Sequence, residues 1–296
     1  MTIPVRPGSA NPMYMFVKLQ KLMLVIGLLL SIIAVRVFSA SASSSSVSPS
    51  GSIGTKIEAA TASVTISTPY GSGPGQNQLD FVQCGKAPTA TATASEGANA
   101  EGEGDILELM LLHGAKYTKE DWVTSGILDS FCLKGGHKIN VVALDLSISA
   151  DGNGLYDAFN ALVGGNVLSG KPVTVISPSA SGKSVVDLTL STFGSEDRKN
   201  IFRSIISSWI PVASPAVLRV REKNEHVFSI FQSMGIPVLA INGKKDAMGK
   251  KVTDMLVHTA GAIPVELKGG HPCYLDSPND FVDSVLSFLY GEKDQS

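Results

Sequence analysis

"VISPSASGKS", residues 175–184, fits the sequence patterns of two different kinds of site. Residues 177–184 are one residue away from the phosphate-binding loop G-x-x-x-x-G-K-[ST], with Ser177 in place of the first glycine. The same stretch fits a nucleophile elbow, small-x-Ser-x-small, with Ser179 at its centre. Both sites need a strand before the loop and a helix after it, so residues elsewhere in the chain must distinguish them.

The composition excludes several classes of protein. The chain has 296 residues, enough for one large α/β domain or two small ones, and its formal net charge of -2 gives no indication of a nucleic-acid partner. The cysteines Cys84, Cys132 and Cys273 can form at most one disulfide, which leaves one thiol over. Because no C-x-x-C or His/Cys cluster is present, we expect no metal site and no other cofactor.

The amino-terminal region carries an apolar segment, "LMLVIGLLLSIIAV", from Leu22 to Val35. As a helix it spans roughly 21 Å, which is short of the ~30 Å hydrocarbon core of a bilayer. Lysines before it and "ASA" at residues 40–42 predict a signal peptide cleaved after Ala42, or an uncleaved signal anchor within residues 1–42. Both outcomes direct the chain to the secretory pathway, as a secreted, lumenal or single-pass membrane protein, in preference to the cytoplasm or an organelle.

Two stretches of low complexity flank the start of the folded region. Residues 43–56 form a Ser-rich linker, and residues 87–105 form an insertion with too little apolar surface to fold. Between them, β-like runs at 62–68 and 79–84 are separated by turn residues, which predicts an antiparallel hairpin. We therefore place the folded domain at residues 57–293.

From Asp105 onward, apolar runs alternate with helical patterns. Strands are predicted at 106–112, 139–145, 172–177, 209–213, 237–242 and 263–267, and helices at about 118–134, 154–168, 182–203, 248–260 and 278–290. Ser277 and Pro278 match the cap and first position of the last helix. With the leading hairpin, this alternation predicts an α/β fold whose eight-stranded, mostly parallel sheet has helices on both faces.

Three polar residues follow strands of this sheet in the order nucleophile, acid, base: Ser179, Asp246 and His271. Ligands bind beyond the carboxyl ends of parallel strands, so these side chains are expected to meet there. A serine hydroxyl becomes a good nucleophile when a histidine takes its proton, and a carboxylate on the other ring nitrogen fixes the tautomer. The sequence therefore predicts a Ser-His-Asp catalytic triad.

The oxyanion hole is expected from two backbone N–H groups, those of Ala180 and, in the "HGAK" loop at residues 113–116, Ala115. Cys273 is interpreted as a packing residue and Asp276 as part of the start of the last helix.

The nucleotide-binding interpretation has further support in "INGKKD", which is similar to the N-K-x-D guanine-reading motif, and in Asp145, which ends a strand as a magnesium ligand would. Against it, Ser177 replaces the glycine of the phosphate loop, and the candidate magnesium strand lies upstream of that loop. It also leaves the "HGAK" and "GGHPCYLD" stretches unexplained. The nucleophile elbow accounts for more of the chain.

These motifs resemble the ABHD14 (alpha/beta hydrolase domain-containing 14) family of the α/β-hydrolase superfamily. "VISPSASG" resembles its elbow, "GGHPCYLDSP" its histidine loop, "LLHGAKYTKEDW" its oxyanion segment and "GKKDAMG" its acid loop. The resemblance implies an α/β-hydrolase fold, the triad Ser179, Asp246 and His271, and esterase-like or acyl-transfer activity on small acyl groups. It also implies that membrane-anchored relatives exist beside soluble ones. The segment "LDLSISADGNG" after Asp145 departs from the family pattern.

Only about two dozen residues separate the strands at 209–213 and 237–242, so we expect a minimal cap and a shallow, open site. The leading hypothesis is a serine hydrolase that cleaves small acyl esters, thioesters or amides through an acyl-enzyme. Its partners would be a small-molecule or acylated substrate and, through Leu22–Val35, a membrane, but no nucleic acid. The alternative is a non-catalytic binding or scaffold protein on the same fold.

Overall fold

The computed structural model describes residues 60–66, 77–85, 106–221 and 224–291, all of which belong to one compact unit, Thr55–Ser296. The predicted signal peptide or anchor (1–42), the Ser-rich linker (43–56) and the insertion (87–105) lie outside the described residues. Within the described ranges, no helix combines the length and apolar character that a membrane crossing requires.

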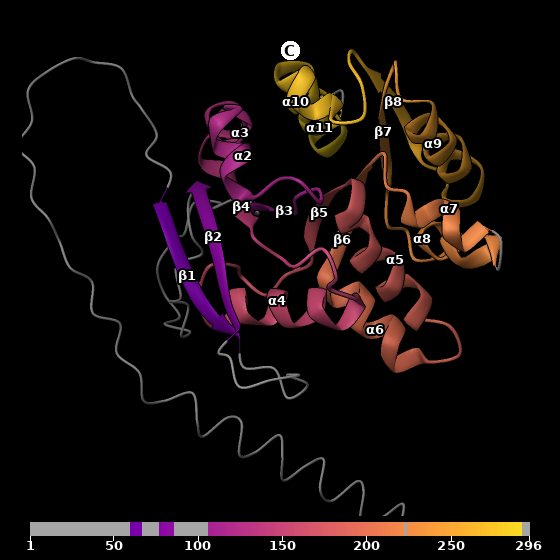
Figure 1. Cartoon of the computed structure of the whole chain (residues 1–296). Helices are drawn as coiled ribbons and strands as arrows, with labels where there is room; N and C mark the ends of the chain where they lie inside the picture. Colours follow the sequence, from indigo (N-terminus) through magenta and orange to yellow (C-terminus); the bar gives the residue numbers. More distant parts are fainter. Residues whose placement is uncertain (1–59, 67–76, 86–105, 222–223, 292–296) are drawn as a thin grey trace, which may run out of the picture. The chain divides into compact units, whose positions relative to one another are not determined.

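An eight-stranded sheet in the order β1-β2-β4-β3-β5-β6-β7-β8 forms the centre of this unit (Figure 1). The strands are β1 Ala60–Ile66, β2 Asn77–Gly85, β3 Leu107–Leu111, β4 Ile139–Leu144, β5 Val173–Pro178, β6 Ile206–Val212, β7 Leu239–Gly243 and β8 Ile263–Leu267. β2 runs antiparallel to both of its neighbours, β1 and β4, and the strands from β4 through β8 are paired in parallel. The predicted mostly parallel sheet of eight strands is confirmed.

Helices cover both faces of the sheet (Figure 1). They are α2 Lys119–Thr124, α3 Ile127–Gly135, η1 Gly136–Lys138, α4 Gly152–Gly164, η2 Ser179–Ser181, α5 Gly182–Ser191, α6 Glu196–Ile205, α7 Ala216–Arg221, η3 Glu225–Phe228, α8 Ser229–Ser233, α9 Ala247–Ala260, α10 Cys273–Asp276 and α11 Pro278–Tyr290. Along β4, Val142 and Leu144 pack with α4 to α9, whereas Val141 and Ala143 pack with α2, α3 and α11. Since successive side chains of a strand point to opposite faces, two separate apolar cores result.

Two predicted helices are wrong in extent, because each is interrupted at a glycine. The helix expected at 118–134 consists of α2 and α3, separated by Gly126 with φ 75°. The helix expected at 182–203 consists of α5 and α6, separated by Gly194 with φ 74°. Glycine adopts this left-handed backbone without the steric cost that a Cβ brings, so the chain turns at both points.

In the described part of the connection between β6 and β7, which excludes residues 222–223, the helices are the short elements α7, η3 and α8. Val217, Phe228 and Phe231 from these helices are fully buried in the core beside α9. Because this connection packs onto the sheet layer, it leaves little chain for a large lid above the carboxyl ends of the strands. The expected minimal cap is confirmed.

The single disulfide that the cysteine count allowed joins Cys84 on β2 to Cys132 on α3, with their Cα atoms 6.1 Å apart. Cys273 is the free thiol and is fully buried. The bridge links the antiparallel hairpin to the helix layer that packs beside β4.

Candidate active site

The turn between β5 and α5 places Ser179 in a strained backbone conformation. Pro178 is extended, with φ −74° and ψ 136°, and Ser179 has φ 51°. A non-glycine residue in the left-handed region is uncommon and costs on the order of 1–3 kcal/mol, so the surrounding structure must hold it there. This is the geometry of a nucleophile elbow, which lifts one hydroxyl above the end of the sheet.

The serines on either side of Ser179 have hydrogen-bond partners of their own. The indole Nε1 of Trp209 on β6 donates to Ser177 Oγ at 2.8 Å, and Ser181 Oγ donates to the carbonyl of Pro178 at 2.8 Å. Both serines are buried, and these bonds satisfy polar groups that burial would otherwise penalise. Serines can therefore occupy the two outer positions where glycine is the commoner choice.

Gly182 allows α5 to start close to the loop after β6. A Cβ at this position would lie 1.9 Å from Ser214 Oγ and 2.6 Å from Ser214 Cβ, which no side chain can accept without a shift. The Gly-Lys-Ser ending that resembled a phosphate loop thus has a packing explanation. Lys183 pairs with Asp187 one turn further along α5, as surface residues of a helix do.

His271 lies between Ser179 and Asp246. Its Nε2 is 2.8 Å from Ser179 Oγ, and its Nδ1 is 2.7 Å from Asp246 Oδ2. The Asp246 side chain is 8% exposed and the His271 side chain 39% exposed, so the carboxylate is shielded while the imidazole faces the site. The structure brings together all three residues that the sequence predicted as a triad.

Asp246 also begins α9. Its Oδ1 accepts the N–H of Gly249 at 2.9 Å, which makes it the N-cap of that helix. A Cβ on Gly249 would lie 2.5 Å from Asp246 Oδ2, so glycine leaves room for the carboxylate. Each carboxylate oxygen thus has its own partner, one on the helix and one on the histidine.

The histidine loop is held by Asp276, for which the sequence indicated no contact with this loop. Asp276 Oδ2 accepts the N–H of Gly270 at 2.7 Å, directly before His271. Gly269 has φ 107°, and a Cβ there would lie 2.2 Å from the same carboxylate oxygen. Asp276 directly precedes Ser277, the N-cap of the last helix, as the sequence indicated, but it also ends the one-turn helix α10, and its carboxylate fixes the loop.

The histidine loop and the acid loop are also joined through their backbones. The N–H of Lys244 donates to Leu267 O at 2.8 Å, and the N–H of Lys245 donates to Gly269 O at 2.9 Å. These bonds continue the pairing of β7 with β8 past the strand ends. They fix the separation between Asp246 and His271 at the level of the main chain.

The loop after β3, predicted to supply an oxyanion donor, lies against the elbow. A Cβ on Gly114 would be 3.7 Å from Ser179 Cβ, and Ala115 lines the same pocket as Ser179. Trp122 Nε1 donates to Leu112 O at 3.1 Å and anchors the start of the loop. Within the described ranges, no backbone hydrogen bond occupies the N–H of Ala115. Ala180, the other predicted donor, directly follows Ser179 in η2.

Asp145, the magnesium ligand of the nucleotide interpretation, is engaged in a different contact. Its Oδ1 accepts the N–H of Lys119 at 2.7 Å, and its Oδ2 lies 2.8 Å from Lys119 Nζ. This hydrogen bond raises the pKa of the Lys119 ammonium, and it ties β4 to the start of α2.

A pocket of about 310 Å³ opens at Ser179 and His271. Its other lining residues are Gly114, Ala115, Lys116, Tyr117, Pro178, Val212, Pro272 and Tyr274. Cys273 is fully buried, and burial raises the pKa of its thiol to about 12, so it stays a neutral packing residue as interpreted from the sequence.

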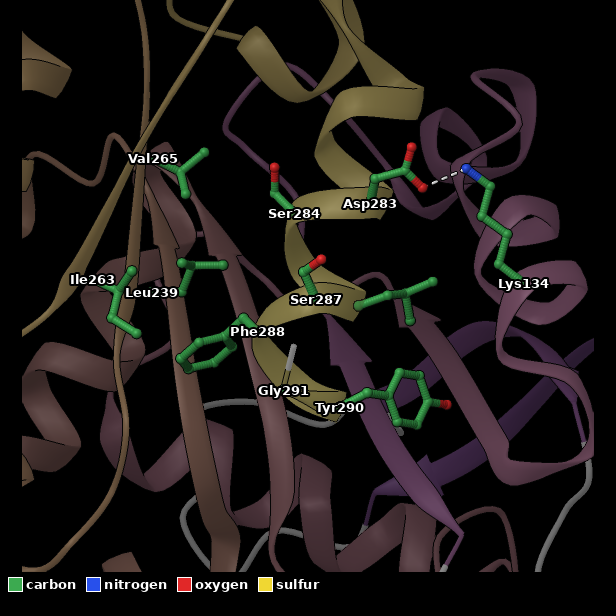
Figure 2. A pocket seen from close by; sticks show the side chains of 11 residues that line it. Lys134, Leu239, Ile263, Val265, Asp283, Ser284, Ser287, Phe288, Tyr290 and Gly291 are labelled. Carbon is green, nitrogen blue, oxygen red and sulfur yellow. Dashed lines mark hydrogen bonds and ion pairs between the residues drawn. The ribbon is translucent and has the colours of Figure 1, made fainter. Parts of the chain in front are cut away.

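A larger hollow of about 1030 Å³ lies elsewhere, between α11 and the strands β7 and β8 (Figure 2). Lys134 and Asp283 form an ion pair at its edge, and Ser284 and Ser287 are its only hydroxyl-bearing residues besides Tyr290. Because no histidine lines this hollow, it lacks the base of a Ser-His-Asp triad. Size alone therefore does not identify the site, and the smaller pocket is the one in which Ser179 and His271 meet.

The comparisons agree with this geometry. No family model matches the sequence. The chain is 28% identical over 191 residues to the "Putative protein-lysine deacylase ABHD14B" of both Pongo abelii and Homo sapiens, covering 62% of this chain and 83% of each relative.

Solved structures of enzymes share the fold at low sequence identity. The fluorophosphonate-binding serine hydrolase F of Staphylococcus aureus is 12% identical with a TM-score of 0.53, over 77% of this chain and 98% of its own. A thermophilic esterase from Thermogutta terrifontis is 13% identical with a TM-score of 0.51, over 78% of this chain and 98% of its own. The chain is therefore similar in sequence to the ABHD14B proteins, as the motif resemblance led us to expect, and it shares the fold of these solved hydrolases.

Proposed function

We propose that this protein is a serine hydrolase of the esterase or acyl-transfer type. The observation that carries the proposal is the pair of short contacts made by His271, 2.8 Å to Ser179 Oγ and 2.7 Å to Asp246 Oδ2. A nucleophile within hydrogen-bond reach of a base, with the base oriented by a carboxylate, is the arrangement that activates a serine.

In the proposed reaction, Ser179 Oγ attacks the carbonyl carbon of an ester, thioester or amide while His271 Nε2 takes the hydroxyl proton. The carbonyl oxygen becomes an oxyanion, held by the N–H groups of Ala180 and Ala115. His271 then gives the proton to the leaving group, which departs and leaves an acyl-enzyme. Water or another acceptor, deprotonated by His271 Nε2, then attacks the acyl carbon. The bond between Ser179 Oγ and the acyl group breaks, His271 returns the proton to Oγ, and the acid or the acylated acceptor leaves.

The pocket supports short acyl groups as substrates. At about 310 Å³ it is at the small end of ligand pockets, and long lipid chains would have to extend beyond it. The relatives are named as protein-lysine deacylases, so acylated lysine side chains join small esters and thioesters among the proposed substrates.

We also propose that the protein enters the secretory pathway, with residues 1–42 as a cleaved signal or an anchor. The disulfide between Cys84 and Cys132 supports an oxidising compartment, since such bonds are rare in the cytosol. Amino-terminal sequencing of the protein purified from its host distinguishes the outcomes: a start at Ser43 indicates cleavage, and a retained segment with resistance to alkaline carbonate extraction indicates an anchor. Recovery in the cytosolic fraction with all thiols reduced would contradict the proposal.

A fluorophosphonate probe applied to the full chain tests the enzymatic proposal. We expect the wild type to be labelled, with the adduct mapped to Ser179 by mass spectrometry, and Ser179→Ala to be unlabelled. Ser191→Ala is the matched control, because this serine donates to Leu188 O within α5 and contacts no triad residue. Labelling of neither protein would favour a non-catalytic binding or scaffold protein, and equal labelling of wild type and Ser179→Ala would assign the reactive group to another residue.

A further inference from the structure

The pocket at Ser179 combines apolar walls with a single lysine. Val212, Pro178 and Tyr274 are buried wall residues, and no aspartate or glutamate lines the pocket. Besides the catalytic His271, the only lining residue with a basic side chain is Lys116. A pocket for neutral alkyl chains would not need this charge, because hydrocarbon gains nothing from a cation.

The Lys116 ammonium is available to a ligand. The residue is exposed, and within the described part of the chain no carboxylate lies within 4 Å of its Nζ. By contrast, the neighbouring Lys119 is bound to Asp145 and Glu120. Lys119, at the start of α2, thus makes a structural contact, whereas Lys116, in the loop before it, lines the pocket.

Lys116 is also only two residues away in sequence from a residue that lies against Ser179. Gly114, whose Cβ position would be 3.7 Å from Ser179 Cβ, precedes it by two residues. Two peptide units span at most about 8 Å between Cα atoms, so the long lysine stem can reach a group only a few bonds from the scissile carbonyl.

Two phenols complete the polar part of the lining. Tyr117 and Tyr274 both line the pocket, and their rings pack edge to face with centroids 6.3 Å apart. Burial raises the pKa of the Tyr274 hydroxyl, so this group remains a neutral hydrogen-bond donor at all physiological pH values. A phenol donor and an ammonium that line the same pocket suit a carboxylate, which accepts from both.

We infer that the pocket selects substrates that carry a carboxylate within a few bonds of the scissile carbonyl, bound by Lys116. The inference deepens the proposed hydrolase function and rests on it. The carboxylate can belong to the acyl chain, as in a dicarboxylic half-ester, or to the leaving group.

Three methyl or alkyl esters separate these cases when hydrolysed by the full chain and followed in a pH-stat. Methyl butyrate is neutral, monomethyl succinate carries the charge on the acyl chain, and the butyryl ester of glycolate carries it on the leaving group. We expect one anionic ester to exceed methyl butyrate in kcat/KM by about tenfold, equivalent to about 1.4 kcal/mol, and the favoured ester identifies the charged portion.

Variants assign that preference to Lys116. Lys116→Gln is expected to remove the tenfold ratio, and Lys116→Arg to keep most of it. Lys138→Gln is the charge-matched control. This exposed lysine directly precedes β4, so it lies at the amino ends of the parallel strands, opposite to the pocket. Raising the salt concentration from 0.05 to 0.5 M, on the order of a threefold change in Debye length, should reduce the ratio in wild type.

The result that would overturn the inference is an anionic ester hydrolysed no better than methyl butyrate, or a ratio that Lys116→Gln leaves unchanged. Equal loss on charged and neutral esters in Lys116→Gln would also overturn it, because it indicates a role at the oxyanion. Labelling by a neutral fluorophosphonate separates these failures from failure of the proposed function: a protein labelled at Ser179 remains a serine hydrolase whatever the ratio.

Discussion

His271 Nε2 lies 2.8 Å from Ser179 Oγ, although 92 residues separate the two along the chain. The parallel sheet produces this contact, because Ser179 follows β5 and His271 follows β8, and the carboxyl ends of parallel strands lie on the same side of the sheet. The acid loop after β7 lies between them in the sheet order and supplies Asp246. Three short loops at the carboxyl ends of the strands are therefore enough to bring a serine, a histidine and an aspartate together.

Replacing Asp246 separates its two tasks. In Asp246→Asn, the side chain keeps an oxygen that can cap Gly249, but it no longer holds His271 as a carboxylate does, and kcat should fall by about 10⁴-fold. Asp246→Ala should lose the cap as well and destabilise the fold by about 1 kcal/mol relative to the asparagine variant. Esterase kinetics and urea unfolding measure the two effects, and an active Asp246→Asn enzyme would contradict the assignment.

Asp276 is expected to act as a positioning residue for His271. Asp276→Ala removes the acceptor of the Gly270 N–H, so kcat should fall by about tenfold or more with little change in KM, since the pocket walls remain. Asp276→Asn retains an oxygen acceptor and should recover most of the rate. Asp280→Ala, an exposed carboxylate in the first turn of α11, is the control. Equal defects in the alanine and asparagine variants would refute a role through this hydrogen bond.

The sequence predicted the strands well because they depend on local pattern, and the order of the polar residues that follow those strands is what indicated a triad. Buried parallel strands such as β4 and β5 are continuous apolar runs, and their polar ends stand out against them. The helix boundaries were less accurate, because Gly126 and Gly194 break helices only where the chain must turn. A glycine within a helical pattern does not by itself show whether the helix continues through it or ends there.

Asp276 was missed for a different reason. Its partner is a backbone N–H six residues earlier, and a backbone group leaves no signature in the sequence. The pairing of Cys84 with Cys132 was open for a similar reason, since three cysteines allow three pairs and only the packing of β2 beside α3 selects one. Contacts that depend on tertiary geometry alone could not be predicted from the sequence.

Gly182 is expected to tolerate no side chain. Gly182→Ala places a Cβ 1.9 Å from Ser214 Oγ, so the variant should lose about 1–3 kcal/mol of unfolding free energy and most of its fluorophosphonate labelling, because the elbow must move. Gly164→Ala is the matched control, since no atom lies within 4 Å of its Cβ position at the end of α4. Adding Ser214→Gly should restore part of the loss. An unchanged Gly182→Ala variant would show that the approach of α5 to Ser214 is not essential.

Cys273 makes stability depend on pH in the alkaline range. Burial raises the pKa of its thiol from 9.0 to about 12, so the folded state keeps a proton that the unfolded state releases. The contribution of this thiol to the free energy of unfolding is therefore fully present below pH 9 and is lost as the pH rises towards 12. Over that range the free energy of unfolding falls by at most about 1.4 kcal/mol per pH unit. Unfolding free energies of wild type and Cys273→Ala, measured from pH 8 to 10.5, should differ in slope above pH 9. Parallel curves would mean that the thiolate is solvated in the folded protein, and rapid alkylation of the native thiol at pH 8 would lead to the same conclusion.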